Sequence, residues 1–327
     1  MFRHFIRRWL IAAALWVAWA APAGAADRPY PTRPVRVVVP FNAGGSTDIL
    51  ARALAKRLGE ELGQPFVVEN KLGAGGAIGA AQVARAAPDG HTLLFTTSYF
   101  ALGPAIMKNV GYDPIRDFVP VSNVAFMPMV LLVRNDLPAS SVSDVIRLAK
   151  QQPGALTYSS SGPGGPPHLA AALFGNLAGI SLTHVPYSGA APALLDVASS
   201  RIDISFSTLL SAVPFLKAGR MRMLAVAYKE RLTGYADVPT FADAGLPALE
   251  MVTMNAMLAP AGTPRAAVDA LYGAIARIVR EPAMHELITE QGALTVGDSP
   301  DHFGDFLRRD VARWAELAVA NNVAAGQ

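Results

Sequence analysis

The amino-acid sequence predicts an α/β protein with two lobes. Segments rich in β-branched residues alternate with segments whose apolar residues recur at helical spacing, which indicates mostly parallel sheets flanked by helices. The order of strand, glycine-rich loop and helix appears twice, and two extended segments, 126–134 and 251–260, lie where the chain would cross between lobes. The length of 327 residues suits one large or two medium domains, because single cores stop growing at roughly 250–300 residues.

The first 25 residues have the features of a secretory signal. Arg3, Arg7 and Arg8 precede an apolar run over 9–21, and the small residues at 23–25 fit the cleavage site of signal peptidase. The run is shorter than the roughly 20 residues that span a bilayer, which favours a cleaved signal over a retained membrane anchor. We therefore expect cleavage after Ala25 and a soluble periplasmic protein, exported by the Sec or the twin-arginine route.

The net charge of the chain resides in this segment. The full sequence has 28 Lys and Arg against 25 Asp and Glu, a net charge of +3, and no cysteine. Residues 1–25 contain three arginines and no acid, so their removal leaves a chain that is neutral by count. Without a basic excess, nucleic-acid binding has no electrostatic support. A sequence without cysteine excludes disulfides, thiolate zinc sites and thiol catalysis.

Each lobe is expected to consist of short alternating elements. In the first lobe, a strand at 35–39 ends at Pro40, and Leu50, Leu54 and Leu58 mark one face of a helix over 49–62. The other elements expected there are a strand at 66–69, a helix at 79–86 and a strand at 92–96. The second lobe has a helix at 142–151, a strand at 156–159 and a helix at 167–177; two C-terminal helices, 264–279 and 302–318, are expected to pack on the first lobe.

Two glycine-bearing loops, 41–48 and 159–168, are candidate anion sites. Each follows a predicted strand, precedes a predicted helix and contains no Lys or Arg. Free N–H groups at a helix start, together with small residues that permit close approach, can bind an anion without a basic side chain. Because open α/β sheets bind ligands at the carboxyl ends of their strands, the two loops would close on one small anion. Ordinary βα turns are the alternative.

Four single residues have two interpretations each. Asp48 either bonds back to a free N–H group in the first turn of its helix or orients a ligand. Asp203 contacts the ligand, or it ends a strand or pairs with Arg201. Tyr187 provides either a pocket hydroxyl or an interface aromatic ring, and His168 either packs at its helix start or touches the ligand.

The motifs of enzymes and metal sites are missing from the sequence. Neither glycine-rich run completes the dinucleotide fingerprint, and neither a phosphate-binding GxxxxGK[ST] loop nor a GxSxG nucleophile elbow occurs. The six histidines show no HxH or HxxxH pairing. We therefore expect no catalytic residue, no metal and no cofactor.

Nine stretches of the chain resemble the solute receptors of tripartite tricarboxylate transporters, the periplasmic Bug group. They are PFNAGGSTD at 40–48; VVEN at 67–70 with GAGG at 73–76 and IG at 78–79; PDG at 88–90 with TLL at 92–94; YDP at 112–114 with DF at 117–118; SGPGGPPH at 161–168; VPY at 185–187; Arg222 with LAV at 224–226; VPT at 238–240; and APAGTP at 259–264.

This resemblance implies a two-lobe periplasmic binding protein of type II, a Venus flytrap with mixed sheets flanked by helices. It implies a signal peptide at 1–25, lobe 1 at 26–127, lobe 2 at 128–253 and a return to lobe 1 at 254–327. The implied ligand is a small carboxylate, which could be a dicarboxylate, a tricarboxylate, an amino acid or an aromatic acid. The expected ligand-binding residues are Phe41, Asn42, Ala43, Gly44, Gly45, Ser46, Thr47, Asp48, Ser98, Ser160, Ser161, Gly162, Gly164, Gly165, Tyr187 and Asp203.

The resemblance also implies a monomeric receptor, not an enzyme, that delivers its ligand to membrane permease subunits. Gly165 stands where relatives often carry Ser or Thr, so one hydroxyl donor is expected to be missing. Residues 253–256 replace an aromatic residue followed by glycine, which alters the wall near the expected hinge. A receptor that signals to a sensor protein and a secreted hydrolase on the same scaffold are the alternatives.

Overall fold

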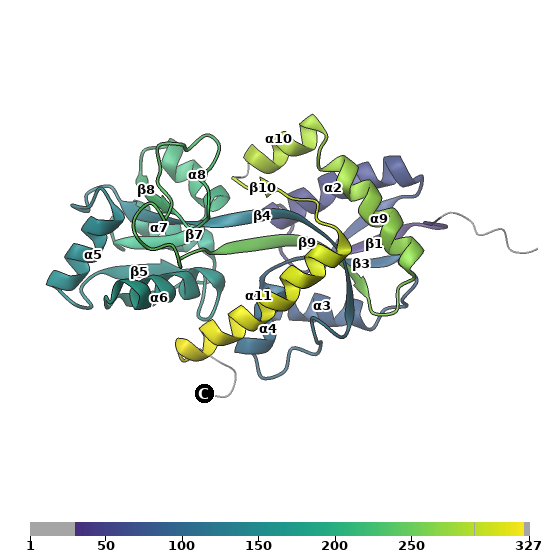
Figure 1. Ribbon diagram of the computed structural model, residues 1–327, viewed down its shortest axis with the longest axis horizontal. Helices are drawn as coiled ribbons and strands as arrows, with labels where there is room; N and C mark the ends of the chain where they lie inside the picture. Colours follow the sequence, from purple (N-terminus) through teal and green to yellow (C-terminus); the bar gives the residue numbers. More distant parts are fainter. Residues whose placement is uncertain (1–29, 291, 324–327) are drawn as a thin grey trace, which may run out of the picture.

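Two groups of strands and helices lie side by side, joined by two long strands (Figure 1). The computed structural model describes residues 30–290 and 292–323, so the expected signal segment at 1–25 lies outside the described residues. The two-lobe α/β architecture predicted from the sequence is confirmed. Within the two described ranges, no helix combines the length and the apolar character needed to cross a membrane.

The sheet of the first lobe forms around β1 (Val35–Val39), whose β-branched side chains are buried on both faces. β1 pairs in parallel with β2 (Phe66–Asn70) on one side and with β3 (Thr92–Thr97) on the other. β3 in turn pairs antiparallel with β9 (Val252–Pro260). The first lobe therefore has a mixed sheet in the order β2-β1-β3-β9-β4.

Helices cover both faces of this sheet. α2 (Ser46–Leu62) buries Leu50, Leu54 and Leu58, as its apolar spacing predicts, and packs beside α9 (Arg265–Ile278). The opposite face is covered by α3 (Ala77–Ala84), by α4 (Tyr99–Ile106) and by α11 (Pro300–Ala320). A short turn, η1 (Ala74–Gly76), precedes α3, and α10 (Pro282–Glu290) lies near α2.

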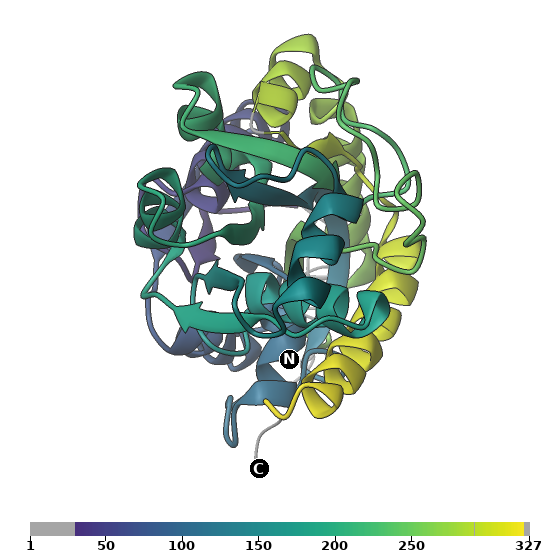
Figure 2. The same ribbon diagram turned by 90° about the vertical axis from the view of Figure 1, so that its left-hand side faces the viewer.

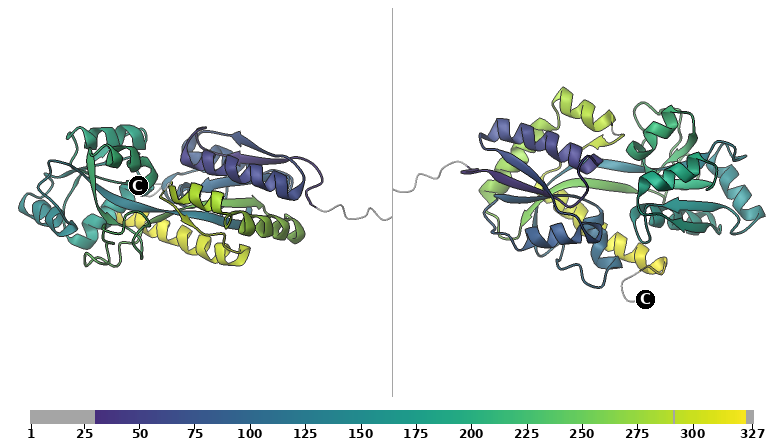
Figure 3. Two further views of the ribbon diagram at one scale, coloured as in Figure 1. Left: turned by 90° about the horizontal axis from the view of Figure 1, so that it is seen from above. Right: turned by 180° about the vertical axis from the view of Figure 1, so that it is seen from behind.

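Two strands connect the lobes, as Figure 3 shows from behind. β4 (Phe118–Arg134) pairs with β9 as far as Pro128 and with β7 (Ile204–Thr208) from Met129 onward. Its last residues also pair with β8 (Met221–Val226), and the two-residue β10 (Leu294–Thr295) pairs with its middle. Every residue of β9 is buried, so these crossing strands pass through the interior of the molecule.

The second lobe, which faces the viewer in Figure 2, continues the sheet in the order β4-β7-β5-β6. β5 (Thr157–Ser160) pairs in parallel with both β7 and β6 (Thr183–Pro186). The helices of this lobe are α5 (Val142–Gln151), α6 (Pro166–Ala178), α7 (Ala190–Ala198) and α8 (Leu209–Lys217). Because β5, β6 and β7 run the same way, their carboxyl ends lie at one edge of the sheet.

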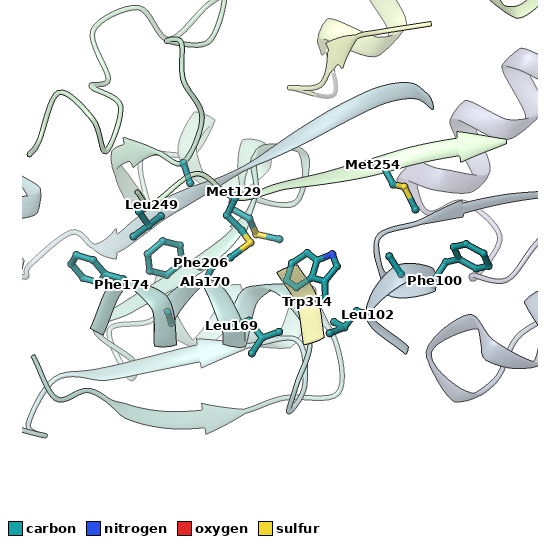
Figure 4. Close-up of a cluster of buried hydrophobic side chains, with 14 of the residues drawn as sticks. Phe100, Leu102, Met129, Leu169, Ala170, Phe174, Phe206, Leu249, Met254 and Trp314 are labelled. Atoms are coloured by element: carbon teal, nitrogen blue, oxygen red, sulfur yellow. The ribbon is translucent and has the colours of Figure 1, made fainter. Parts of the chain in front are cut away.

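The long helix α11 touches both lobes, whereas the sequence predicted packing on the first lobe alone. It contacts α4 and β4, and near its end Asn176 of α6 donates a hydrogen bond of 3.4 Å to Asn321. Trp314 on this helix is buried in one cluster with Leu102 of α4, Leu169 of α6 and Met129 of β4 (Figure 4). Elements of both lobes therefore share one hydrophobic cluster behind the crossing strands.

Candidate functional site

A cleft of about 290 Å³ receives residues from both lobes. Its walls come from the loop after β1, from the ends of β3, β5 and β7, and from the crossing strands β4 and β9. None of the residues that line it is charged, and most of its polar groups are hydroxyls. The lining residues are Phe41, Asn42, Gly45, Ser46, Thr47, Thr97, Tyr99, Met127, Met129, Ser161, Pro166, Pro167, Ala190, Ser207, Thr208, Ser211 and Thr253.

Several helices begin at this cleft without a side chain capping their first amides. The residues that precede α2, α7 and α8 are Gly45, Gly189 and Thr208, and at none of these positions does a side chain accept a hydrogen bond from an amide of the helix. By contrast, Ser141 and Ser299 cap the starts of α5 and α11, neither of which contributes a lining residue. Free N–H groups and the positive ends of helix dipoles therefore meet in a cleft that lacks basic side chains.

The two glycine-bearing loops contribute in different ways. Backbone amides are available in the first loop, where Ser46 and Thr47 begin α2 and line the cleft. The second loop leads into α6 through Pro166 and Pro167, which have no N–H group to donate.

The amides of the second loop are also bonded within the loop. The Gly162 amide donates to the Ser160 hydroxyl at 3.2 Å, the Gly164 amide to Nδ1 of His168 at 2.9 Å, and the Gly165 amide to the Gly162 carbonyl at 3.4 Å. This loop meets the cleft through Ser161 and the two prolines. His168 takes the packing role that the sequence left open, because its ring nitrogen holds the loop.

Asp48 acts as a latch on the first loop rather than as a wall of the cleft. Its carboxylate is buried and accepts hydrogen bonds from the Gly44 amide at 2.9 Å, from Nε of Arg52 at 2.8 Å and from Nδ2 of Asn70 at 2.8 Å. Asn70 also donates to the Phe41 carbonyl at 2.9 Å. Burial raises the pKa of Asp48, but these hydrogen bonds outweigh it, so that the pKa is lowered overall.

Asp203 lies at the opposite end of the sheet from the cleft. It precedes β7, whereas the cleft contacts Ser207 and Thr208 at the end of that strand. Its carboxylate accepts from Nε of Arg134 at 2.9 Å and from the amide and hydroxyl of Thr157, both at 2.8 Å. Pairing with Arg201, one of the alternatives for Asp203, does not occur, because Arg201 contacts Asp196 instead.

Tyr187 and Ser98 are also turned away from the cleft. The Tyr187 hydroxyl donates to Asp196 at 2.7 Å, and burial together with this carboxylate raises the pKa of Tyr187 to about 12. Ser98 is fully buried; its hydroxyl accepts from the Met254 amide at 3.0 Å and donates to Asp310 at 3.4 Å. Neither residue lines the cleft, nor do the expected residues Ala43, Gly44 and Ser160.

A serine and a histidine approach each other in the second lobe. The Ser160 hydroxyl lies 2.7 Å from Nε2 of His184, a distance at which a histidine could act as a base. The serine is buried, however, and its hydroxyl also contacts both backbone groups of Gly162 at 3.0 and 3.2 Å. Burial and the neighbouring His168 lower the pKa of His184 to about 4.

This pair holds the loop. The His184 ring stacks on the rings of both Tyr158 and His168, at centroid distances of 4.8 and 4.0 Å. Within 30–290 and 292–323, no carboxylate is hydrogen-bonded to that ring, and no group of three potential metal ligands forms. The motif search of the sequence could not have detected Ser160 and His184 together, because they lie on neighbouring strands.

Sequence reasoning missed most of the residues contributed by strand ends and crossing strands. Among these are Tyr99 at the start of α4, Thr208 before α8 and Met127 on β4. The rule that ligands bind at the carboxyl ends of parallel strands points to Thr97, Ser207 and Thr208. Thr97 ends β3, which the sequence predicted, and Ser207 and Thr208 could have been found in the same way if β7 had been recognised.

The chain was compared with protein families and with solved structures. Residues 50–323 match the family described as the tripartite tricarboxylate transporter family receptor. A structure from R. palustris determined with adipate is 37% identical, covers 90% of this chain and 99% of its own, and has a TM-score of 0.81. The periplasmic binding protein BugD is 33% identical, with 90% and 100% coverage and a TM-score of 0.77.

A third structure is MatC from Rhodopseudomonas palustris with bound malate. It is 33% identical, with coverage of 88% of this chain and 99% of its own and a TM-score of 0.76. All three similarities extend over both lobes and agree with the family match. The chain belongs to the receptor family of the tripartite tricarboxylate transporters.

Proposed function

We propose that this protein is a periplasmic receptor that binds a small carboxylate in the cleft and delivers it to a tripartite membrane transporter. One observation carries the proposal: uncapped helix starts and hydroxyl groups meet in a cleft without a charged side chain. Such a site suits an anion, since N–H groups and helix dipoles supply the positive potential. The related structures with adipate and malate support a carboxylate as the ligand.

The proposed contacts divide between the lobes. Gly45, Ser46 and Thr47 would bind one carboxylate through the start of α2, while Ser161 and the start of α8 would approach from the second lobe. A ligand that contacts both lobes binds the closed arrangement more tightly than the open one and so shifts the population toward closure. The closed form would then be recognised by the permease subunits.

The remaining parts of the proposal concern location and organisation. The N-terminal signal and the periplasmic location of the related BugD support export and cleavage after Ala25, and we propose that the receptor is a monomer. We propose lobe boundaries near residues 127 and 253, since β4 exchanges β9 for β7 between Pro128 and Met129. No catalytic step is assigned, because the family consists of receptors and Ser160 is enclosed by its own loop.

The proposal is tested with protein stripped of bound ligand and a thermal-shift screen against carboxylates. Ligand at about 100 times its Kd adds roughly 2.7 kcal/mol to stability. Ser46→Glu places an acid at the first position of α2, which suits the helix dipole but fills the anion site. The matched control is Thr233→Glu at an exposed position that does not line the cleft.

We expect wild type and Thr233→Glu to show the same shift and Ser46→Glu to lose it while melting at an unchanged or higher temperature without ligand. An equal ligand shift in all three proteins would exclude this cleft as the binding site. A complete lack of response to dicarboxylates, tricarboxylates, amino acids and aromatic acids by the wild type would contradict the proposed ligand class.

A further inference from the structure

A second cavity, of about 520 Å³, lies next to the cleft. The two cavities have two lining residues in common, Tyr99 and Ser161, whose hydroxyl oxygens are 3.3 Å apart. Tyr99 begins α4 in the first lobe, and Ser161 follows β5 in the second. A hydrogen-bonded pair from opposite lobes therefore stands between the two spaces.

We propose that Tyr99 is a partition that limits the length of the bound acid, and that the cavity behind it is a subsite for an apolar tail. This inference rests on the proposed function, because it takes the cleft as the site of the carboxylate. The cleft alone lies at the lower end of the roughly 300–1,000 Å³ typical of ligand pockets, which suits a short acid. Opening the partition would join it to the larger cavity.

The position of the Tyr99 ring explains why residue 165 is a glycine, although the backbone conformation at that position does not require one. Gly165 has φ −69° and ψ 165°, an extended conformation open to any residue. A Cβ atom at this position would lie 2.6 Å from the Tyr99 hydroxyl, closer than atoms can approach. The sequence suggested that Gly165 deprives the site of a hydroxyl; the structure places the Tyr99 hydroxyl there instead.

A second aromatic ring lies next to Tyr99. The Phe41 ring is 6.4 Å from it between centroids and is tilted by 60°. Burial raises the pKa of Tyr99, and its hydrogen bond with Ser161 lowers it in part, so the hydroxyl stays protonated at neutral pH. The Tyr99 side chain is therefore an uncharged wall, held by packing against its neighbours and by one hydrogen bond to Ser161.

The second cavity has the chemistry of an apolar subsite. Its walls include Ile106, Met107 and Pro163, and no charged side chain lines it. The amides of Gly162 and Gly164 also border it, but both are already bonded within their loop. These two amides are not free to bind a second carboxylate, whereas a hydrocarbon chain or an aromatic ring would lose only contact with water.

The test measures affinity against chain length by calorimetry, with straight-chain monocarboxylates from butanoate to decanoate. In the wild type, affinity should stop rising once the tail reaches the partition. In Tyr99→Ala, it should continue to rise by about fourfold per added CH₂, the increment for burying one methylene group. Tyr99→Phe is the matched control, since it keeps the ring and should keep the length limit. If Tyr99→Ala does not fold, Tyr99→Leu provides the same comparison.

A second measurement tests the fit between Tyr99 and Gly165. Gly165→Ala should weaken the binding of short acids at least about tenfold in the wild-type background but by less than about threefold in Tyr99→Ala, because the 2.6 Å clash is then gone. If short acids still bind and the length limit is the same in wild type and Tyr99→Ala, the partition role of Tyr99 is refuted, but the proposed function is not. Absence of binding by any acid to the wild type would instead overturn the proposed function.

Discussion

The latch formed by Asp48 gives the sharpest prediction about how the first loop is held. Asp48→Ala removes three hydrogen bonds to a carboxylate of which only 2% is exposed. A hydrogen bond to a charged group contributes roughly 1.5–3 kcal/mol, but half-exposed Arg52 can exchange its bond for water. The losses at Gly44 and Asn70 then dominate. Because Gly44 is exposed, we expect a decrease near the lower end for two such bonds, about 3 kcal/mol in the free energy of unfolding at pH 7.

The pH dependence of this effect has a defined sign. The pKa of Asp48 is below its usual 3.8 in the folded protein, so the unfolded state binds the proton first as the pH falls. The stabilisation is therefore complete above pH 3.8 and is lost as the pH falls through the lowered pKa. Urea unfolding of wild type and Asp48→Ala at pH 7 and pH 3 should show a smaller difference at pH 3.

The control is Asp301→Ala, which removes an exposed acid from the first turn of α11 and should change stability little. A decrease below about 0.5 kcal/mol for Asp48→Ala at pH 7 would refute the latch. If that small decrease came with complete loss of ligand binding, the alternative role of Asp48 as a ligand contact would be favoured instead. Loss of stability with weakened binding is the result that a loop-positioning residue predicts.

Two further predictions concern residues outside the cleft. Burial raises the pKa of Asp310 to about 6, so ionisation of this carboxyl group opposes folding at neutral pH. Asp310→Asn should therefore raise the free energy of unfolding by about 1–3 kcal/mol at pH 7.5, and this gain should disappear below pH 4. Thermal melts of both proteins at the two pH values would test this. Asp203→Ala should lower the melting temperature, because it breaks the contacts with Arg134 and Thr157. It should change the ligand affinity, measured by calorimetry, by less than about twofold. A tenfold loss of affinity would instead show that Asp203 belongs to the binding site.

Elements with a strong local pattern were predictable from the sequence. The strand at 35–39 and the helix at 142–151 occur with the expected bounds, since one has a β-branched run and the other a regular apolar face. The extended segment expected at 126–134 is the second half of β4, which begins at Phe118; Pro120 and two irregularities in its pairing with β9 obscure the first half. α4 was missed because Gly103 and Pro104 interrupt its helical pattern.

The candidate site was predictable only in part, for a physical reason. Glycine-rich loops that follow strands can be recognised from the local sequence. Six of the expected residues, among them Ser46 and Ser161, line the cleft. The position of Asp203 depends on which end of β7 meets the cleft, which needs the pairing of β7 with β4. Likewise, the sequence near Tyr99 does not indicate that its hydroxyl would meet a serine 62 residues away in the other lobe.

The central claim is that the cleft binds an anion through helix starts and hydroxyl groups instead of basic side chains. Its most direct test is a calorimetric titration of stripped protein with the best-binding carboxylate of the screen and with the neutral amide of the same acid. We predict that the acid binds at least about tenfold more tightly than the amide, since hydrogen bonds to a charged group are the stronger ones, and that Ser46→Glu abolishes this preference. Equal affinity for acid and amide would contradict the claim.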